Sequence, residues 1–449
     1  MSCVSLFRVF ACVAATAFAL QACSLLPEWM GGEKEEKKLK GERVSLFSEE
    51  NAIHVAKDGD SVPFVIPAQK NITSWPRSAV TFSDRPDHPA LAERLEEKFT
   101  ADFDLDNEDE GVYVPPVVVM DTIYTLDAEG VVRAFGGQKF REKLWQTKLT
   151  KNDEGYFRFG GLGVYQGNVY VNSGGNALYA LDAKNGRILW SKRVSGVLRG
   201  APAFYGNSVI AATLTNRLYA LSLKDGETLW SHEATEGGVG YVGTASPTVY
   251  RDAVLAAYSS GDVYVLRADT GEAMWSRNIL SDQDPSRGRP NVGDVGVSPQ
   301  VYAGYVILAA RAGHLSVNDL PSGGYVWKMN VKIENEPWAA AEYLYGITGD
   351  NELFALHVPT STIRWKYGLG LYKDAKEKKG RRLFSAPVLA GNRLYVASAD
   401  ETLYAFSPED GKEKAEYDIP KHVYHSPIAV SGRLMLMAPD GKLTVFGEK

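Results

Sequence analysis

Cysteine is nearly absent from this chain, which has 449 residues and only three cysteines. Cys3, Cys12 and Cys23 all lie at the start of the chain, so no disulfide can stabilise the rest of it. A run long enough to span a bilayer is also missing, because the apolar run over residues 9–20 is too short. The net charge of −6 gives no basis for nucleic-acid binding. Stability must therefore come from a buried core, which a chain of this length can form.

Residues 1–22 are predicted to be a signal peptide and not part of the fold. Arg8 supplies positive charge, the apolar run follows, and small residues precede Cys23. Residues 20–23 read LQAC and resemble the lipobox of bacterial lipoproteins. That resemblance implies cleavage before Cys23, acylation of this cysteine and, because Ser24 follows, an outer-membrane location. The alternative is an ordinary signal peptide in which the cysteine occurs by chance.

Two predictions concern the stretch between the signal peptide and the repeats described next. Residues 23–60 are expected to be a lipidated, flexible tether, because a mixed-charge run within them has little to bury. Leu91, Leu95 and Phe99 recur every four residues and predict one short amphipathic helix. This helix would lie in a partly acidic insertion near residues 87–111.

Six of the nine tryptophans occupy one position of a repeated pattern, close to Ala-Leu-Asp, then a Gly turn, then Trp. They recur at intervals of roughly 40 to 50 residues, which is the length of one four-stranded propeller blade. Glycine supplies the positive φ of a tight turn, and a flat Trp between blades can bury about 200 Å². We therefore expect these tryptophans to be structural. They are Trp145, Trp190, Trp230, Trp275, Trp327 and Trp365.

The repeats predict an all-β fold, a single eight-bladed β-propeller with four-stranded blades over residues 61–449. Repeat seven has Ala415 at the Trp position, and repeat eight ends after its visible strands with no Gly turn and no Trp. A propeller either closes its ring or leaves an exposed edge. The outer strand of the last blade is therefore expected to come from the N-terminal part of the chain. Residues 62–73, which are apolar at first and compatible with a strand, are the candidate.

An export signal, a lipobox and eight such repeats together resemble the BamB family of the outer-membrane β-barrel assembly (BAM) machinery. The resemblance implies a non-catalytic scaffold on the periplasmic face of the outer membrane. It would dock on the periplasmic domains of BamA, work with other BAM subunits and assist outer-membrane protein clients.

Contact residues follow from the same resemblance. It implies a BamA contact at Leu198 and Arg199, in a Leu-Arg-Gly sequence shortly before a blade-opening proline. It also implies a contact at Asp294, five residues before a later proline, although Gly296 stands where the family has a second Asp. An ordinary loop arginine is the alternative for Arg199.

Two other interpretations remain open. Quinoprotein dehydrogenases share the repeat and hold calcium and pyrroloquinoline quinone (PQQ) on the axis. The chain offers no cysteine pair and no convincing calcium ligands, and His422 and His425 would point to opposite faces of a strand. We therefore expect no catalytic residue, no metal and no cofactor. The other interpretation is a different periplasmic adaptor, in which the basic loop over residues 373–382 would meet lipid headgroups or an acidic partner.

Overall fold

The computed structural model describes most of the chain from residue 53 onward, and all described residues belong to one compact unit, Glu50–Lys449. The described ranges are 53–56, 63–79, 87–103, 114–149, 160–234, 245–280, 296–310, 314–420, 423 and 425–449. Within these ranges, no helix is long and apolar enough to cross a membrane.

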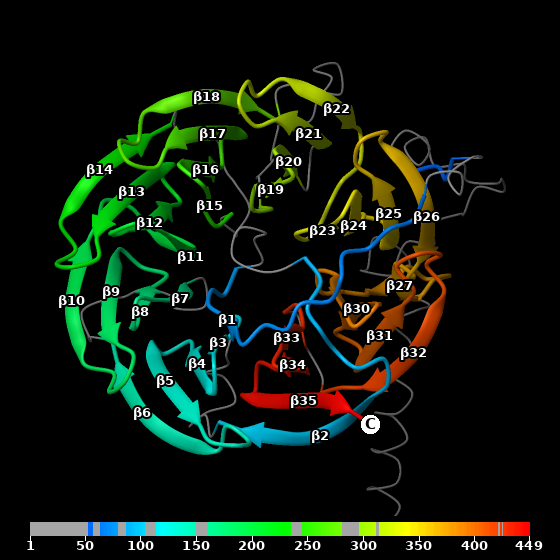
Figure 1. The fold of residues 1–449 in the computed structure, drawn as a ribbon, viewed down its shortest axis with the longest axis horizontal. Coiled ribbons are helices and arrows are strands. Elements are labelled where there is room, and N and C mark those ends of the chain that lie inside the picture. The colour runs from blue at the N-terminus through cyan, green and yellow to red at the C-terminus, as the bar shows by residue number, and fades with distance from the viewer. Residues whose placement is uncertain are drawn as a thin grey trace, which may run out of the picture. The chain divides into compact units, whose positions relative to one another are not determined.

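Eight small antiparallel sheets are arranged in a ring, which confirms the eight-bladed propeller (Figure 1). The innermost strands of blades 1 to 8 are β3 (Val117–Val119), β7 (Gly161–Tyr165), β11 (Leu198–Tyr205), β15 (Thr248–Tyr250), β19 (Gln300–Tyr302), β23 (Trp338–Ala340), β29 (Val388–Ala390) and β33 (Ile428–Val430). The second strands are β4 (Thr122–Leu126), β8 (Asn168–Asn172), β12 (Ser208–Thr213), β16 (Ala253–Ala257), β20 (Tyr305–Ala309), β24 (Tyr343–Ile347), β30 (Arg393–Ser398) and β34 (Arg433–Met437). The third strands are β5 (Val131–Gly136), β9 (Ala177–Asp182), β13 (Arg217–Ser222), β17 (Asp262–Arg267), β21 (Leu315–Asp319), β25 (Glu352–His357), β31 (Thr402–Phe406) and β35 (Lys442–Glu448). The outermost strands are β6 (Glu142–Lys148), β10 (Ile188–Arg193), β14 (Thr228–Glu233), β18 (Ala273–Asn278), β22 (Tyr325–Met329), β26 (Thr362–Gly368), β32 (Glu413–Asp418) and β2 (Leu95–Asp102).

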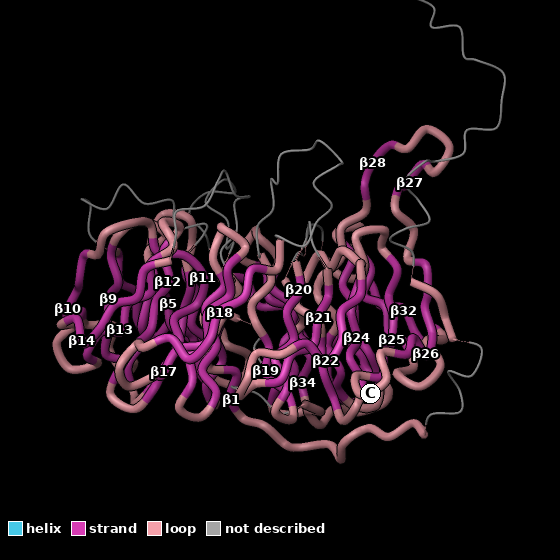
Figure 2. Tube along the Cα trace, turned by 90° about the horizontal axis from the view of Figure 1, so that it is seen from above, coloured by secondary structure: helices cyan, strands magenta, loops and turns pink. Residues whose placement is uncertain are grey.

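Three further strands lie outside this scheme, and they distinguish the two faces of the ring (Figure 2). β1 (Ser74–Trp75) adds to the inner edge of blade 1, beside β3. β27 (Tyr372–Asp374) and β28 (Lys379–Arg381) form a hairpin between blades 6 and 7. We call the side with this hairpin, where outermost strands lead to the next blade, the connection face. The opposite side, where third and outermost strands are joined by tight turns, is the turn face.

Burial differs between the middle and the edge of each blade. Every residue of β12 is buried, whereas half-buried and exposed positions alternate along β10 and most of β14. The second strands contact a neighbouring blade on each face, so both faces must be apolar. The outermost strands meet a neighbour on one face only, which gives the two-residue alternation seen in their sequences.

Each repeat tryptophan reaches into the next blade. Its indole N–H donates a hydrogen bond to a backbone carbonyl there, at 2.6–3.1 Å. The donor and acceptor residues are Trp145 and Ala183, Trp190 and Leu223, Trp230 and Ala268, Trp275 and Leu320, Trp327 and Val358, and Trp365 and Pro408. The tryptophans therefore join blades 1 to 7 in sequence.

The same tryptophans press on the turn between the third and outermost strands of the next blade. In five of the six cases the turn residue is a glycine, and a Cβ built on it would lie 2.4–2.7 Å from the indole. In the sixth, Ser361 adopts a φ of 55° beside Trp327. Blade 8 has no such turn, because its outermost strand is supplied by β2. A tryptophan at Ala415 would have no turn to contact, which explains why the pattern stops there.

The last blade is closed by an N-terminal strand, as the truncated eighth repeat predicts, but the helix prediction is wrong. β2, which pairs antiparallel with β35, covers most of the segment expected to be helical. A bulge before Phe99 reverses the side-chain alternation, so Leu95 and Phe99 point to opposite faces of the strand. Leu95 packs with residues of blade 7, whereas Phe99 lies beneath Lys139 of blade 1 at 5.8 Å. The spacing of Leu95 and Phe99 thus reflects a bulged strand that places one apolar side chain on each face.

Residues 62–73, the predicted closing strand, do not pair with the last blade, so this assignment is also wrong. Of this segment, residues 63–73 are described, and they run along the turn face. Pro63 and Pro67 lack the N–H groups that a ladder strand must donate. Apolar residues here cover the end of the core instead of completing a sheet.

The segment crosses the turn face from blade 6 to blade 1. The Phe64 ring packs on Tyr343 of blade 6, with 5.4 Å between the ring centroids. Further along, the Ile72 carbonyl accepts a hydrogen bond from the Ser431 N–H of blade 8 at 2.7 Å. β1 then joins blade 1, so one short stretch of chain connects three blades.

The chain returns along the same face through Asp87 and His88. The Asp87 carbonyl accepts the indole N–H of Trp338 at 2.8 Å. His88 is fully buried, and its Nε2 accepts the Asn392 N–H at 3.1 Å. Its Nδ1 must then carry the proton and donate to the Pro67 carbonyl at 2.6 Å. The His88 imidazole therefore holds the two parallel segments, residues 63–73 and 87–91, against blade 7.

Replacing Gly411 with alanine is expected to destabilise the ring more than the same change at Gly432. Both glycines have a φ of +67°, so both substitutions carry the same left-handed strain of about 1–2 kcal/mol. A Cβ on Gly411 would lie 2.4 Å from Trp365, whereas a Cβ on Gly432 has nothing within 4 Å. Overlap with the indole should cost a further 1–3 kcal/mol or so, measured by urea unfolding. Equal losses would show that the tryptophan contact adds nothing.

Candidate functional site

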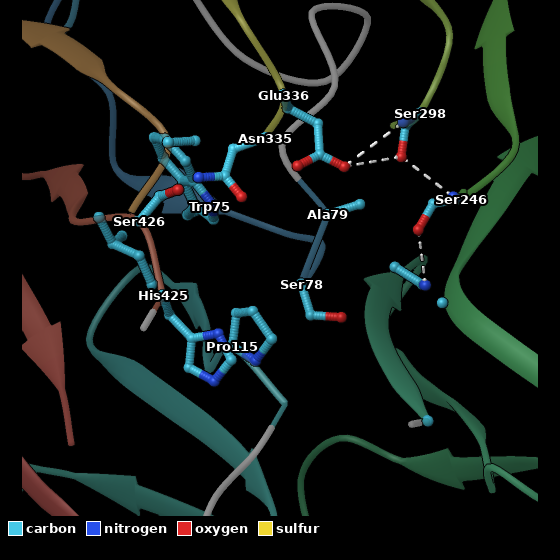
Figure 3. A pocket seen from close by; sticks show the side chains of 15 residues that line it. Trp75, Ser78, Ala79, Pro115, Ser246, Ser298, Asn335, Glu336, His425 and Ser426 are labelled. Atoms are coloured by element: carbon cyan, nitrogen blue, oxygen red, sulfur yellow. Dashed lines mark hydrogen bonds between the residues drawn. The ribbon is translucent and has the colours of Figure 1, made fainter. Parts of the chain in front are cut away.

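A cavity of about 210 Å³ lies on the axis of the ring (Figure 3). Its wall is built mainly from residues just before or at the start of the innermost strands, so that every blade contributes. Its floor comes from the N-terminal segment that follows β1. The described lining consists of Trp75, Ser78, Ala79, Pro115, Gly160, Gly200, Ala201, Ser246, Ser298, Asn335, Glu336, Ala386, His425, Ser426 and Ile428.

Hydrogen bonds run from blade to blade around one side of this cavity. The Ala201 N–H donates to Ser246 Oγ at 2.9 Å, and the Ser246 N–H donates to Ser298 Oγ at 3.0 Å. The Ser298 hydroxyl in turn donates to Glu336 Oε1 at 3.2 Å. Asn335 continues the series by donating from Nδ2 to the Phe384 carbonyl of blade 7 at 2.9 Å. These bonds fix the inner ends of blades 3 to 7 relative to one another.

The chemistry of the described lining does not fit a quinone cofactor that carries several carboxylates. Glu336 is its one acidic side chain, and it contains no lysine or arginine to pair with a carboxylate. Among the residues that the structure describes, no group of three or more His, Cys, Asp or Glu side chains could hold a metal ion. The described part of the lining therefore offers hydroxyl, amide, carboxylate and imidazole groups.

Below this floor, a buried arginine fills the axis. Arg77 is 2% exposed, and its Nε donates to the Pro202 carbonyl at 2.7 Å. Nη2 donates to the carbonyls of Ala201, at 3.4 Å, and Pro247, at 3.0 Å. Beside it, Ser78 exchanges two hydrogen bonds with the backbone of blade 2. The N-terminal segment thus ties blades 2, 3 and 4 together from inside the ring.

The two predicted contact residues that are described lie at the connection-face end of β11. Leu198 pairs with Thr213 and is fully buried between blades 2 and 3. Arg199 pairs with Ala212, is half-buried, and directly precedes Gly200 of the cavity wall. Leu198 therefore anchors the strand, whereas the Arg199 side chain is only partly exposed, with its Nε and Nη1 atoms buried. Asp294 and Cys23 lie outside the described residues.

Sequence reasoning missed Arg77 and the floor of the cavity. The repeat pattern reports on residues that recur in each blade, whereas the N-terminal segment occurs once. The sequence around Arg77, between Pro76 and Ser78, matches no known motif. Its burial becomes visible only in the structure, where the N-terminal segment enters the ring.

Comparison with known protein families shows the family to which the chain belongs. The family model described as outer membrane protein assembly factor BamB matches residues 116–367 and 373–449. The chain belongs to the BamB family. The match covers all the repeats and begins after β2, so the N-terminal segment with Arg77 lies outside the part matched.

Individual relatives of this BamB-family chain agree with that assignment. The protein of Escherichia coli (strain K12) named outer membrane protein assembly factor BamB is 26% identical over 333 residues, which cover 73% of this chain and 82% of the relative. The crystal structure of BamB from Moraxella catarrhalis superposes with a TM-score of 0.65 at 19% identity, covering 79% of this chain and 100% of that one.

Quinoproteins share the fold. Quinohemoprotein alcohol dehydrogenase from Comamonas testosteroni superposes with a TM-score of 0.61 at 14% identity, covering 84% of this chain and 81% of that one. An identity this low relates the two architectures and says nothing about shared chemistry.

Replacing Arg77 with methionine should destabilise the ring by about 3 kcal/mol. Methionine keeps the apolar bulk but leaves the carbonyls of Ala201, Pro202 and Pro247 without their buried charged donor. Urea unfolding measures the loss, with Arg187→Met as the control because Arg187 is exposed on a turn. If both variants unfold at the same urea concentration, the axial arginine does not hold the blades together.

Proposed function

We propose that this chain is a non-catalytic scaffold subunit of the outer-membrane β-barrel assembly complex. It docks on the periplasmic domains of BamA beside other BAM subunits and assists folding and insertion of outer-membrane proteins. The observation that carries this proposal is the BamB family match across the whole ring of repeats. The name of the Escherichia coli relative, an outer membrane protein assembly factor, supports it.

The proposed location is the periplasmic face of the outer membrane. Residues 1–22 would direct export, and acylated Cys23 would anchor the mature chain. The support is the lipobox-like sequence at residues 20–23 together with the family assignment. The ring would then be held near the membrane by the residues between Cys23 and Ile53.

The proposed BamA contact centres on Arg199. Burial of Leu198 fixes the end of β11 and with it the position of the neighbouring, partly exposed arginine. Arginine is enriched among residues that dominate binding energy, because its planar guanidinium makes several hydrogen bonds at once. Asp294 is proposed to belong to the same contact, where a carboxylate would orient the guanidinium or pair with the partner.

The axial cavity favours a scaffold over an enzyme. A quinoprotein must bind an anionic cofactor beside a cation, and the described lining supplies neither lysine nor arginine. The similarity to quinohemoprotein dehydrogenases is explained by the shared propeller alone. Detection of bound PQQ with dye-linked dehydrogenase turnover in the purified protein would overturn this conclusion.

Arg199→Glu is expected to abolish co-purification with BamA from solubilised membranes, while the thermal melt stays within a few degrees of the parent. Reversing the charge removes the donor and adds repulsion, which costs several kcal/mol at an interface. Arg187→Glu, on the turn face, makes the same charge change and should retain BamA. Retention of BamA by the Arg199 variant would remove this residue from the contact. If the parent recovers a different envelope complex and no BamA, the chain is another kind of adaptor.

A further inference from the structure

The hairpin between blades 6 and 7 stands out from the connection face (Figure 2). Its two strands pair through Tyr372 with Arg381 and Asp374 with Lys379. Residues 372–382, which we call the basic hairpin, contain six basic and two acidic side chains. Their net charge of +4 contrasts with the net charge of −6 for the whole chain.

Ion pairs hold the base of the basic hairpin. Lys373 and Arg382 both bind Asp400 of blade 7, at 2.7 Å and 3.1 Å. Arg381 binds Glu334, before blade 6, at 3.1 Å. Partial burial alone would raise the pKa of Asp400, but the hydrogen bonds from Lys373 and Arg382 lower this pKa below its usual value. The base is therefore a charged network that fixes the direction in which the hairpin points.

The tip of the basic hairpin carries lysines that form no ion pair with other described residues. Lys376, Lys378 and Lys379 are exposed, and their ammonium groups have no hydrogen-bond or ion-pair partner among the described residues. The Asp374 carboxylate is occupied by the N–H groups of Lys376 and Glu377, at 2.9 Å and 3.0 Å. The tip thus presents three lysines, with Glu377 the one acidic side chain between them.

The type of cation at each place indicates the kind of partner. Both arginines lie at the base and are engaged within the protein, whereas the tip has lysines and no aromatic side chain. Protein interfaces are enriched in arginine and aromatic residues and depleted in lysine. Clustered lysines, as strongly hydrated point charges, suit the diffuse negative potential of a lipid surface. We propose that the tip of the basic hairpin binds the anionic headgroups of a membrane surface.

The place where the N-terminal part of the chain joins the ring supports a membrane surface as the partner of the hairpin. Ile53 is 3% exposed, and the Ala56 N–H donates to the Ile363 carbonyl of β26 at 3.1 Å. The chain therefore meets the ring at blade 6, at the turn-face end of β26, and the opposite end of the same strand leads into the basic hairpin. An anchor at the predicted lipidation site Cys23 would bring this sector toward the bilayer first. Blade 3, which carries Arg199, lies across the ring from it (Figure 1).

An acyl chain and a basic patch reinforce each other, because one lipid chain alone gives marginal membrane binding. The hairpin would then orient the ring, with blades 6 and 7 toward the lipid and blade 3 free for a protein partner. This role is additional to the proposed BamA contact and does not depend on it.

The test is co-sedimentation of the unit Glu50–Lys449 with vesicles of phosphatidylcholine, with or without phosphatidylglycerol. This unit contains all eight blades and the closing strand, and it lacks Cys23, so acylation cannot contribute. We expect binding only to vesicles with phosphatidylglycerol, lost in high salt. Replacing Lys376, Lys378 and Lys379 together with glutamine should weaken it about 100-fold, or about fivefold for each lysine at the surface.

A matched control replaces Lys184, Lys224 and Lys414 with glutamine. These lysines are exposed on blades 2, 3 and 7, and the change in net charge is the same. The control should bind the anionic vesicles like the parent. The proposal is overturned if the parent ignores phosphatidylglycerol, if the tip variant binds as well as the parent, or if the control is weakened equally.

Two further outcomes separate this proposal from others. If the tip variant keeps its vesicle binding but loses an acidic protein on co-purification, the hairpin is a protein contact and the lipid proposal fails. Arg199→Glu should leave vesicle binding unchanged. Loss of BamA by that variant, with vesicle binding intact, would confirm that the two surfaces act separately.

Discussion

The interlock between a tryptophan and the tight turn of the next blade is the constraint on which this ring depends. Each indole is held by a hydrogen bond to a carbonyl, and five of the six also contact a glycine turn that leaves no room for a side chain. Burying an indole of about 200 Å² contributes up to roughly 5 kcal/mol before entropy is counted. One interlock orients only two blades relative to each other, but six interlocks in succession determine how blades 1 to 7 curve into a ring. A side chain larger than serine would overlap the indole, so the tryptophan and a small turn residue recur together along the chain.

Blade 8 has no tryptophan interlock on either side, and there the N-terminal part of the chain takes over. Between blades 7 and 8, Tyr417 packs edge-on against Phe446, while Leu95 of β2 adds apolar contacts. Between blades 8 and 1, Phe103 stacks on Phe135 with 4.2 Å between the ring centroids. The segment before β2 also binds blades 6, 7 and 8 on the turn face. The two joints that the repeat cannot close are thus closed by residues outside the repeat.

The difference between joints made by the repeat and joints made by residues outside it explains what could be predicted from the sequence. The ring, its blade number and its closure follow from a pattern that occurs several times, so that each repeat is independent evidence for the same blade structure. The helix predicted at Leu95 and Phe99 was wrong because a β-bulge places apolar residues four apart on opposite faces of a strand, and this spacing mimics that of a helix. The closing strand was placed too early because apolar character alone cannot distinguish a blade strand from a covering segment. Arg77 had no signal at all, since its environment is built by carbonyls of distant blades.

The covering segment also determines where a partner can bind. Its two segments, which run parallel where Lys70 pairs with Pro89, are held together by the His88 imidazole and occupy the turn face between blades 6 and 1. Arg77, next to the residues that form the cavity floor, binds carbonyls of blades 3 and 4. The connection face carries both Arg199 and the basic hairpin, in sectors that lie across the ring from each other. Because six interlocks and the axial arginine make the ring rigid, these two sectors stay at a fixed separation. A rigid ring can therefore hold a protein partner at one edge while its opposite edge meets another surface, which is a mechanical role that needs no catalytic group.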